Sequence, residues 1–298
     1  MISVIIPVYN SSEFLEDAIN SVLSQDVCYE IILVDDGSTD SSGQICDRYG
    51  AIYDNIIVIH QKNSGVTKAR NAGFENSKGE YILFLDSDDM LYENALDSML
   101  SHMHPDVDIV ISEVREEGVI TADEYIYYIL NGYIPAGING KLFRRRLFNE
   151  NTLALSREIN IGEDLIMNVK LALNATKCIR EVSKSVYFYR VNSSSVIQTR
   201  KYDWNYEKKF IVELNKAFGN QRERYKDSIL QSYYITIERL VIHKAKINWS
   251  DPILLEFVSW AKKHPMSLKQ FIIINIRNSV IAKYLLALHR RIIVLCQL

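Results

Sequence analysis

Residues 81–89 have the sequence Tyr-Ile-Leu-Phe-Leu-Asp-Ser-Asp-Asp, and this stretch decides the fold. Its five apolar or aromatic residues have the length of a strand buried on both faces of a parallel sheet. Three carboxylates, Asp86, Asp88 and Asp89, follow within four positions. Their mutual repulsion and lost hydration would be offset by a divalent cation. Because ligands bind at this edge of open α/β sheets, we expect a metal–diphosphate site here. The alternative is that the acids cap the next helix, a role that suits Asp89.

The flanking sequence alternates between short apolar runs and helical patterns. Strands are predicted over 4–8, 30–34, 56–59 and 108–114, and helices between them, including one over 92–103. This alternation predicts right-handed crossovers and a mainly parallel α/β sheet with helices on both faces. Ser11 and Ser12 are expected to cap the first helix. Because polar clusters directly follow the strands, they should meet at one edge of the sheet.

The later part of the chain alternates less clearly. We expect helices over 123–131, 165–173 and 227–248, a glycine-rich loop over 132–140 and one more strand over 186–190. A loop with this glycine content can shape a binding site.

Charge is distributed unevenly along the 298 residues. The whole chain has a formal net charge of -3, which does not indicate a nucleic-acid partner. No Asp or Glu follows Glu256, while seven Lys and Arg residues do, so the remainder of the chain carries -10. The four cysteines form no C-x-x-C pair and fit a reducing compartment. Because a strand pattern begins at Ile2, we expect no signal peptide and a cytoplasmic protein.

Six stretches, taken together and in order, resemble a family 2 glycosyltransferase with the GT-A fold. They are residues 3–10, 30–40, 63–73, 79–89, 139–143 and 162–165. A lone D-x-D motif is weak evidence, but several matches in their expected strand–loop context are strong. The resemblance implies transfer of a sugar from a nucleotide-sugar donor with inversion at the anomeric carbon. It covers about two-thirds of the chain, so we expect a GT-A catalytic domain over 1–200 and a helical extension over 201–298.

The resemblance also implies a nucleotide pocket, with a uridine diphosphate sugar as the expected donor. Asp36 is suited to accept from the ring N–H of a uracil, and Tyr9 offers an aromatic face. The alternative for the two consecutive aspartates is a turn. Arg70 suits a phosphate, or alternatively holds a D-x-D carboxylate. The residues assigned to the nucleotide are Pro7, Tyr9, Asp35, Asp36, Asn63, Gly65, Lys68, Arg70 and Asp86.

The D-x-D pair is assigned to a divalent metal, Mn²⁺ or Mg²⁺. Asp88 would coordinate the metal directly, while Asp86 would contact the ribose or reach the ion through water. The diphosphate would complete the coordination shell. Several relatives place a metal-binding His near residues 187–189, where this chain has Tyr-Phe-Tyr, so the third protein ligand is left open.

An inverting transfer also needs a base on the acceptor side. Asp164 matches the position of the base in the family, and Glu163 would orient the acceptor. Taken alone, this pair would be an acidic helix start. Lys141 and Arg190 are the cations expected to contact diphosphate or acceptor.

Residues 266–298 are basic, acid-free and amphipathic, a pattern typical of a helix lying in a membrane interface. The interrupting charges argue against a spanning helix. The alternative is a pair of core helices or the interface of a homodimer.

We therefore expect a metal-dependent glycosyltransferase, peripheral on the inner face of the plasma membrane. Its acceptor would be a glycan or a lipid-linked oligosaccharide in cell-surface polysaccharide synthesis. One alternative is a sugar-nucleotide nucleotidyltransferase, which the sequence Pro7-Val8-Tyr9-Asn10 disfavours because a glycine-rich loop is expected there. The other is a non-catalytic binding or assembly subunit with the same fold.

Overall fold

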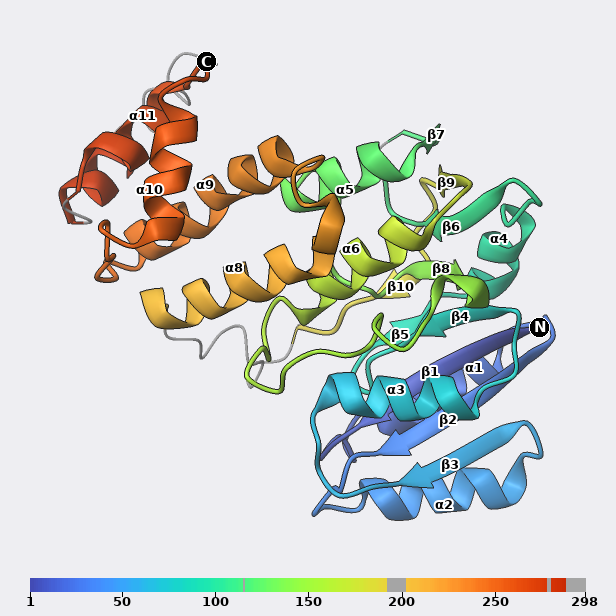
Figure 1. Ribbon diagram of the computed structural model, residues 1–298. Coiled ribbons are helices and arrows are strands. Elements are labelled where there is room, and N and C mark those ends of the chain that lie inside the picture. Colours follow the sequence, from blue (N-terminus) through green and yellow to red (C-terminus); the bar gives the residue numbers. More distant parts are fainter. Residues whose placement is uncertain (115, 192–201, 278–279, 288–298) are drawn as a thin grey trace, which may run out of the picture. The chain divides into compact units, whose positions relative to one another are not determined.

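The computed structural model describes residues 1–114, 116–191, 202–277 and 280–287. The chain divides into two compact units (Figure 1). The first unit comprises Met1–Ile129 and Ile134–Ser195, and the second comprises Leu130–Tyr133 and Val196–Leu298. The boundary expected at residue 200 lies outside the described residues.

A mixed, mainly parallel sheet forms the centre of the first unit. Among the described residues it has eight strands in the order β3-β2-β1-β4-β8-β6-β9-β7. The strands are β1 (Ile2–Val8), β2 (Tyr29–Asp35), β3 (Ile56–His60), β4 (Tyr81–Phe84), β6 (Val107–Ile111), β7 (Gly118–Ile120), β8 (Lys141–Arg144) and β9 (Cys178–Glu181). The first four pair in parallel, as predicted, whereas β8 lies antiparallel between β4 and β6.

Helices cover both faces of this sheet, as predicted for the α/β fold (Figure 1). Apolar residues of α1 (Leu15–Leu23), α2 (Ser42–Ile52) and α4 (Ala95–Ser101) share one core with β1. Helix α3 (Val66–Asn76) packs on the other face, where a Cβ atom at Gly73 would lie 2.4 Å from Ile5 Cγ2. Only glycine allows this close approach of α3 to β1 and β2.

Three local predictions are wrong. Ser11 and Ser12 do not cap α1, which has no side-chain cap, because the Ser11 hydroxyl instead bonds the Ser87 hydroxyl at 2.6 Å. The helix predicted over 92–103 begins at Ala95, because residues just before it form β5 (Met90–Leu91). The strand predicted over 186–190 is reduced to β10 (Tyr187–Phe188), which pairs with β5.

The remaining elements of the first unit follow β7. Helix α5 (Ala122–Leu130) precedes the glycine-rich loop, and η1 (Arg145–Leu147) follows β8. Helix α6 (Glu163–Asn174) begins at the acidic pair, and its N-cap Gly162 has a φ of +88°.

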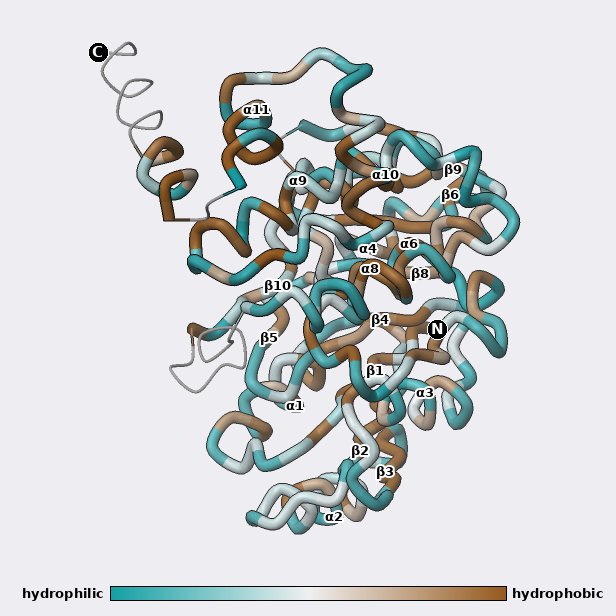
Figure 2. Tube along the Cα trace, turned by 60° about the vertical axis from the view of Figure 1, so that its left-hand side comes forward, coloured by the Kyte–Doolittle hydropathy of each residue, from teal (hydrophilic) through white to brown (hydrophobic). Residues whose placement is uncertain are grey.

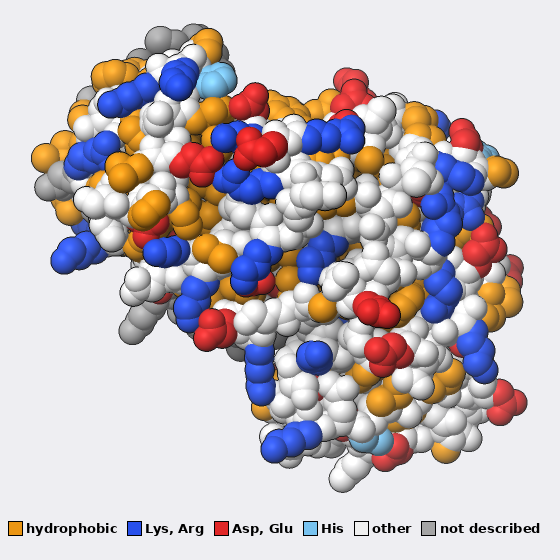
Figure 3. Space-filling view, in the orientation of Figure 1, with side chains coloured by type: hydrophobic (Ala, Val, Ile, Leu, Met, Phe, Trp, Pro, Cys, Tyr) orange, Lys and Arg blue, Asp and Glu red, His pale blue; other side chains and the backbone are white. Residues whose placement is uncertain are grey.

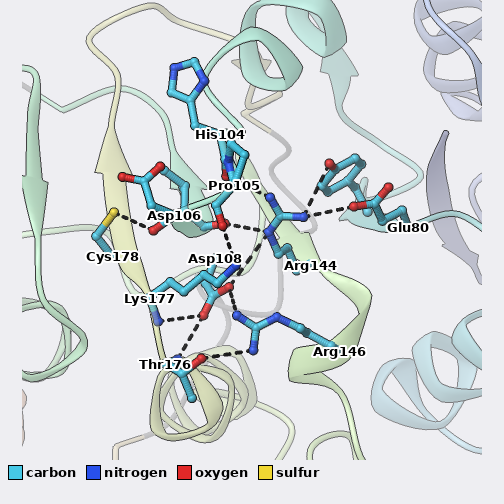
Figure 4. Close-up of polar contacts among 12 residues, drawn as sticks. Glu80, His104, Pro105, Asp106, Asp108, Arg144, Arg146, Thr176, Lys177 and Cys178 are labelled. Carbon is cyan, nitrogen blue, oxygen red and sulfur yellow. Dashed lines mark hydrogen bonds and ion pairs between the residues drawn. The ribbon is translucent and has the colours of Figure 1, made fainter.

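The buried carboxylate of Asp108 in β6 bonds the segment that follows β8 and the segment that precedes β9 (Figure 4). Asp108 accepts the backbone N–H groups of Thr176 and Lys177 at 2.9 and 3.0 Å and pairs with Arg146. Arg144 Nε lies 3.9 Å from the same carboxylate and donates to the Val107 carbonyl at 2.6 Å. This cluster lies at the amino end of β6, opposite the edge where the predicted site residues gather.

The second unit is helical in the residues described. It contains α8 (Trp204–Phe218), η2 (Gly219–Gln221), α9 (Lys226–Ile242), α10 (Pro252–Ala261) and α11 (Leu268–Asn275), and residues 280–287 are also helical. Its core includes Ile211, Tyr233, Ile237 and Phe257. Hydrophobic stretches along α10 and along β1 of the first unit are brown in Figure 2.

Helix α9 ends six residues earlier than the predicted helix 227–248, shortly before Lys244 adopts a φ of +57°. Among the residues described, no helix has both the length and the apolar content needed to cross a membrane.

Candidate active site

Arg70 joins the two halves of the predicted site. Its guanidinium donates to Asp86, directly after β4, at 3.0 Å and to Asp164, at the start of α6, at 2.6 Å. The side chain is 2% exposed. Burial opposes its charge, but Asp164 and then Asp86 outweigh this effect, so the pKa of Arg70 is raised. Arg70 therefore holds a D-x-D carboxylate, which was the alternative considered for it, and also holds the expected base.

Asn139 forms a hydrogen bond with the second carboxylate oxygen of Asp86. Its side-chain amide donates to Asp86 Oδ2 at 2.6 Å, while Arg70 contacts Oδ1. The Asn139 Oδ1 atom is buried and has no hydrogen-bond partner within the described part of the chain. Both oxygens of Asp86 are thus engaged by the protein, which leaves Asp88 as the freer carboxylate of the pair.

Asp88 is a half-buried carboxylate in an acidic part of the site. In the described chain, no other residue donates a hydrogen bond to its carboxylate, and burial followed by the charge of Asp86 raises its pKa. Glu163 and Asp164 add further negative charge around Arg70. This excess of acid fits a divalent cation. No group of three or more His, Cys, Asp or Glu side chains in the described residues could hold the ion by itself, so a cation would take most of its ligands from elsewhere.

Asp164 is held from two sides. Besides Arg70 on Oδ1, the backbone N–H of Ile138 donates to Oδ2 at 3.3 Å. The neighbouring Glu163 is different, because burial and then the charge of Asp164 raise its pKa to about 7. The two acids of α6 thus have distinct surroundings: the Asp164 carboxylate is held by Arg70 and by the Ile138 N–H, whereas burial dominates at Glu163.

Lys141 organises the loop beside Asp164. Its ammonium donates to the carbonyls of Pro135 and Gly137, and the side chain is buried. Burial lowers the pKa of Lys141 to about 8. Asn168 of α6 donates to the Ala136 carbonyl at 2.7 Å. We expected Lys141 to contact diphosphate or acceptor, but in this structure its ammonium supports the loop that carries Ile138.

The two aspartates after β2 also bind the chain itself. Asp36, 3% exposed, accepts from the Gln61 side chain at 2.6 Å and from the backbone N–H groups of Ser64 and Gly65 at 2.8 Å each. These bonds fix the loop that leads into α3. We expected Asp36 to face a uracil; in this structure its carboxylate oxygens accept from the loop before α3.

Asp35 accepts from the Ser38 N–H and from His60, each at 2.9 Å. Burial alone would raise the pKa of Asp35, but the hydrogen bonds from Ser38 and His60 lower it.

The other predicted nucleotide residues lie on the same edge. Pro7 is buried near the end of β1, and Tyr9 follows it with 50% of its surface exposed. Asn63 accepts from Arg157 at 2.8 Å, and Gly65 has a φ of +91° directly before α3. Lys68 is exposed in the first turn of α3. Tyr9 and Lys68 therefore remain accessible to a ligand.

Asp89 does not start a helix, because α4 begins at Ala95. Its carboxylate accepts from the Tyr187 hydroxyl at 2.5 Å and the Arg190 N–H at 2.8 Å. The Arg190 guanidinium donates to the Asp88 carbonyl at 3.0 Å and to Asp17 at 2.9 Å. Arg190, expected to contact diphosphate or acceptor, is thus used to hold the D-x-D turn.

Sequence reasoning missed several residues of this network. Asn139 was noted only as part of a motif, and Tyr187 only as a position without histidine. Gln61 and Asn168 carried no signal at all, because amides that bond loop carbonyls or carboxylates have no sequence pattern of their own. Their partners become apparent only when the loops are folded.

Residues 3–158 match the family model described as glycosyl transferase family 2. The chain is 29% identical over 228 residues to the glycosyltransferase GlyA of Streptococcus pneumoniae serotype 4, which covers 68% of this chain and 32% of GlyA. It is 34% identical over 239 residues to the minor teichoic acid biosynthesis protein GgaA of Bacillus subtilis strain 168, covering 73% of this chain and 53% of GgaA. The chain thus spans about a third of one of these relatives and half of the other.

Solved structures share the fold. Residues 1–349 of S. aureus TarS in complex with UDP-GlcNAc give a TM-score of 0.61 at 21% identity, covering 81% of this chain and 83% of that one. The mannosyltransferase PcManGT from Pyrobaculum calidifontis, in complex with GDP-Man and Mn²⁺, gives 0.56 at 16% identity over 98% of this chain and 79% of that one. The expected GT-A fold is confirmed.

Proposed function

This chain belongs to glycosyl transferase family 2, and on that premise we propose that it is a metal-dependent, inverting glycosyltransferase. The observation that carries the proposal is the bridge from Asp86 through Arg70 to Asp164. This bridge connects two parts of the site. One is the edge of the sheet, where a nucleotide would bind, and the other is helix α6, which would carry the base. A binding subunit without catalysis would have no need for a charged, buried link between them.

The donor is proposed to be a nucleoside-diphosphate sugar, with uridine as the nucleoside. TarS was solved with UDP-GlcNAc and with UDP, which supports this choice. Tyr9 supplies an exposed ring for stacking, and Asp36 shapes the pocket by fixing the loop before α3. Lys68, Asn63 and Gly65 stand at the entrance to that helix.

Asp88 is the residue that would hold the divalent metal, with diphosphate oxygens as most of the other ligands. When bound, the metal would stabilise the negative charge that develops on the departing nucleoside diphosphate. The Mn²⁺ in the PcManGT complex supports this cofactor. Asp86 would contribute through its contacts to Arg70 and Asn139 and through the ribose.

Asp164 is proposed as the base that accepts the proton of the attacking acceptor hydroxyl. Arg70 holds one of its oxygens and the Ile138 N–H holds the other, so the carboxylate is oriented before the acceptor arrives. Glu163 can donate a hydrogen bond to the acceptor when it is protonated. Lys141 acts through the loop that holds Ile138.

The acceptor is proposed to be a glycan or lipid-linked oligosaccharide of a cell-surface polysaccharide, as the name of GgaA supports. The catalytic domain is proposed to occupy residues 1–200 and the helical extension 201–298, close to the division between the two units.

The enzyme is proposed to lie on the cytoplasmic face of the membrane through the end of the second unit. Basic and hydrophobic side chains intermingle over α10 and α11 (Figure 3). Leu268, Phe271 and Tyr284 are 59%, 50% and 66% exposed, and Lys262 and Lys263, which follow α10 in the chain, are exposed as well. Exposed apolar side chains flanked by cations complement an anionic lipid surface. The part of the predicted tail at 288–298 lies outside the described residues.

Asp164→Asn tests the proposal most directly. Transfer should fall at least about a hundredfold, because the base is lost, while metal-dependent UDP binding measured by calorimetry should stay within about twofold. Asp97→Asn is the matched control, since Asp97 is an exposed acid in the first turn of α4. The donor for the assay comes from a screen of nucleotide sugars for thermal stabilisation. Full transfer by Asp164→Asn would exclude Asp164 as the base.

A further inference from the structure

The segment from Tyr187 to Arg190 grips the D-x-D turn through side chains. The Tyr187 hydroxyl donates to Asp89 Oδ2 at 2.5 Å and accepts from the Asp86 N–H at 3.3 Å. Asp89 is 1% exposed and Tyr187 is 8% exposed. One phenol thus contacts both ends of the turn that carries Asp88.

Arg190 completes the grip from the other end of the segment. Its backbone N–H donates to Asp89 Oδ1 at 2.8 Å, and its Nε donates to the Asp88 carbonyl at 3.0 Å. The guanidinium is itself held by Asp17 at 2.9 Å and lies over the ring of Phe14. Helix α1 and the residue before it therefore brace Arg190 against the turn.

The backbone alone provides little of this attachment. The pairing of β5 with β10 involves two residues on each strand, Tyr187 with Leu91 and Phe188 with Met90. Asp86 and Asp88 repel each other, and inside the turn one backbone bond runs from the Asp89 N–H to the Asp86 carbonyl at 3.1 Å. Arg70 and Asn139 hold the Asp86 carboxylate at the start of the turn. The side chains of Tyr187, Asp89 and Arg190 hold its other end, beyond Asp88.

We propose that Tyr187, Asp89 and Arg190 are positioning residues for the metal–diphosphate site and preorganise the turn that presents Asp88. None of the three needs to touch the metal. This inference rests on the proposed function, because it assumes that Asp88 is the metal ligand. The inference gives Asp89 and Arg190 a role in the affinity for metal-bound nucleotide. This role differs from helix capping by Asp89 and from diphosphate contact by Arg190.

Tyr187→Phe is the sharpest test, because it removes one buried hydroxyl and leaves the ring. UDP binding in the presence of Mn²⁺ should weaken about tenfold, while binding of UDP without metal should stay within about twofold. Calorimetry measures both affinities, and the EPR signal of free Mn²⁺ reports metal binding directly. Tyr189→Phe is the matched control: it removes the same group two residues later, where the side chain is 57% exposed, and should change neither affinity.

A second pair of variants separates positioning from folding. Asp89→Asn keeps an oxygen for the Arg190 N–H and should bind metal–UDP more tightly than Asp89→Ala does. Thermal unfolding of each variant shows whether the fold persists. Equal loss of UDP affinity with and without Mn²⁺ in Tyr187→Phe, or no loss at all, would overturn the inference. If the unchanged protein binds no UDP even with Mn²⁺, the proposed function fails instead.

Discussion

His60, at the end of β3, is a single side chain that contacts two aspartates, Asp35 and Asp47. Its Nδ1 atom lies 2.9 Å from Asp35, and its Nε2 atom lies 2.9 Å from Asp47. The hydrogen bond to Asp47, followed by the bond to Asp35, raises the pKa of His60. Protonated His60 therefore braces the turn that begins at Asp35.

This contact should make stability depend on pH in a definite direction. Because the folded-state pKa of His60 lies above the unfolded value of about 6.5, its contribution is complete below that pH and is lost as pH rises through the folded value. With 47% of the imidazole side chain exposed, the contribution should be about 0.5 kcal/mol. Urea unfolding of His60→Gln and the unchanged protein from about pH 5.5 to 8.5 measures it. A difference that grows with pH would contradict the assignment.

The functional role of a side chain could be predicted from sequence where the residue directly follows a predicted strand. Asp86, Asp88 and Asp164 stand out because carboxylates at the ends of apolar runs are costly without a partner. Their division of labour could not be predicted, since it depends on Arg70 and Asn139, which come from distant segments. The same holds for Asp89, whose partner Tyr187 lies 98 residues away.

At the scale of elements, Asp108 fastens β6 to the turn before β9. The carboxylate is fully buried, and its removal would leave two backbone N–H groups and the Arg146 guanidinium without their acceptor.

Asp108→Ala should therefore lower the free energy of unfolding by about 3 kcal/mol. Urea denaturation followed by circular dichroism measures the loss. Asp106→Ala is a suitable control: Asp106 is exposed two residues earlier, and it is its backbone carbonyl that accepts from Cys178. Equal stability of the two variants would show that the cluster in Figure 4 does not secure this edge.

The early strands could be predicted from sequence because each is an uninterrupted apolar run. Strand β8 could not be predicted, because two of its four residues, Lys141 and Arg144, are charged and interrupt the apolar pattern. The strand lies between β4 and β6 in the sheet. The two-residue strands β5 and β10 are too short for any periodicity. Because β5, paired with β10, occupies residues just before it, α4 begins at Ala95, too far along the chain for Asp89 to cap it.

At the scale of the whole molecule, the basic stretch without Asp or Glu that follows Glu256 belongs to the second unit. Its last described helices expose Leu268 and Phe271 on α11, while Ile273 and Ile274 of the same helix are buried. Sequence pattern predicted a basic amphipathic segment, but not which apolar residues the unit itself would bury.

Replacing Leu268 and Phe271 together by Asn should weaken binding to anionic vesicles about tenfold, because both lose apolar contact with the lipid. Co-sedimentation with phosphatidylglycerol vesicles at low and high salt measures this, and salt should weaken the unchanged protein as well. Ile52→Asn is the control, since Ile52 is 64% exposed on α2 of the first unit. Undiminished sedimentation of the double variant would place any membrane contact elsewhere.

The bridge formed by Arg70 also limits how the chain can be shortened. Asp164 lies 94 residues beyond Arg70 and follows the end of the family match at residue 158. A fragment ending there would keep a guanidinium that is 2% exposed and lose one of the two carboxylates that neutralise it. Such a truncation would leave the buried Arg70 charge with one carboxylate partner, Asp86, in place of two. We therefore expect a fragment that ends at residue 158 to be less stable than one that extends into α6.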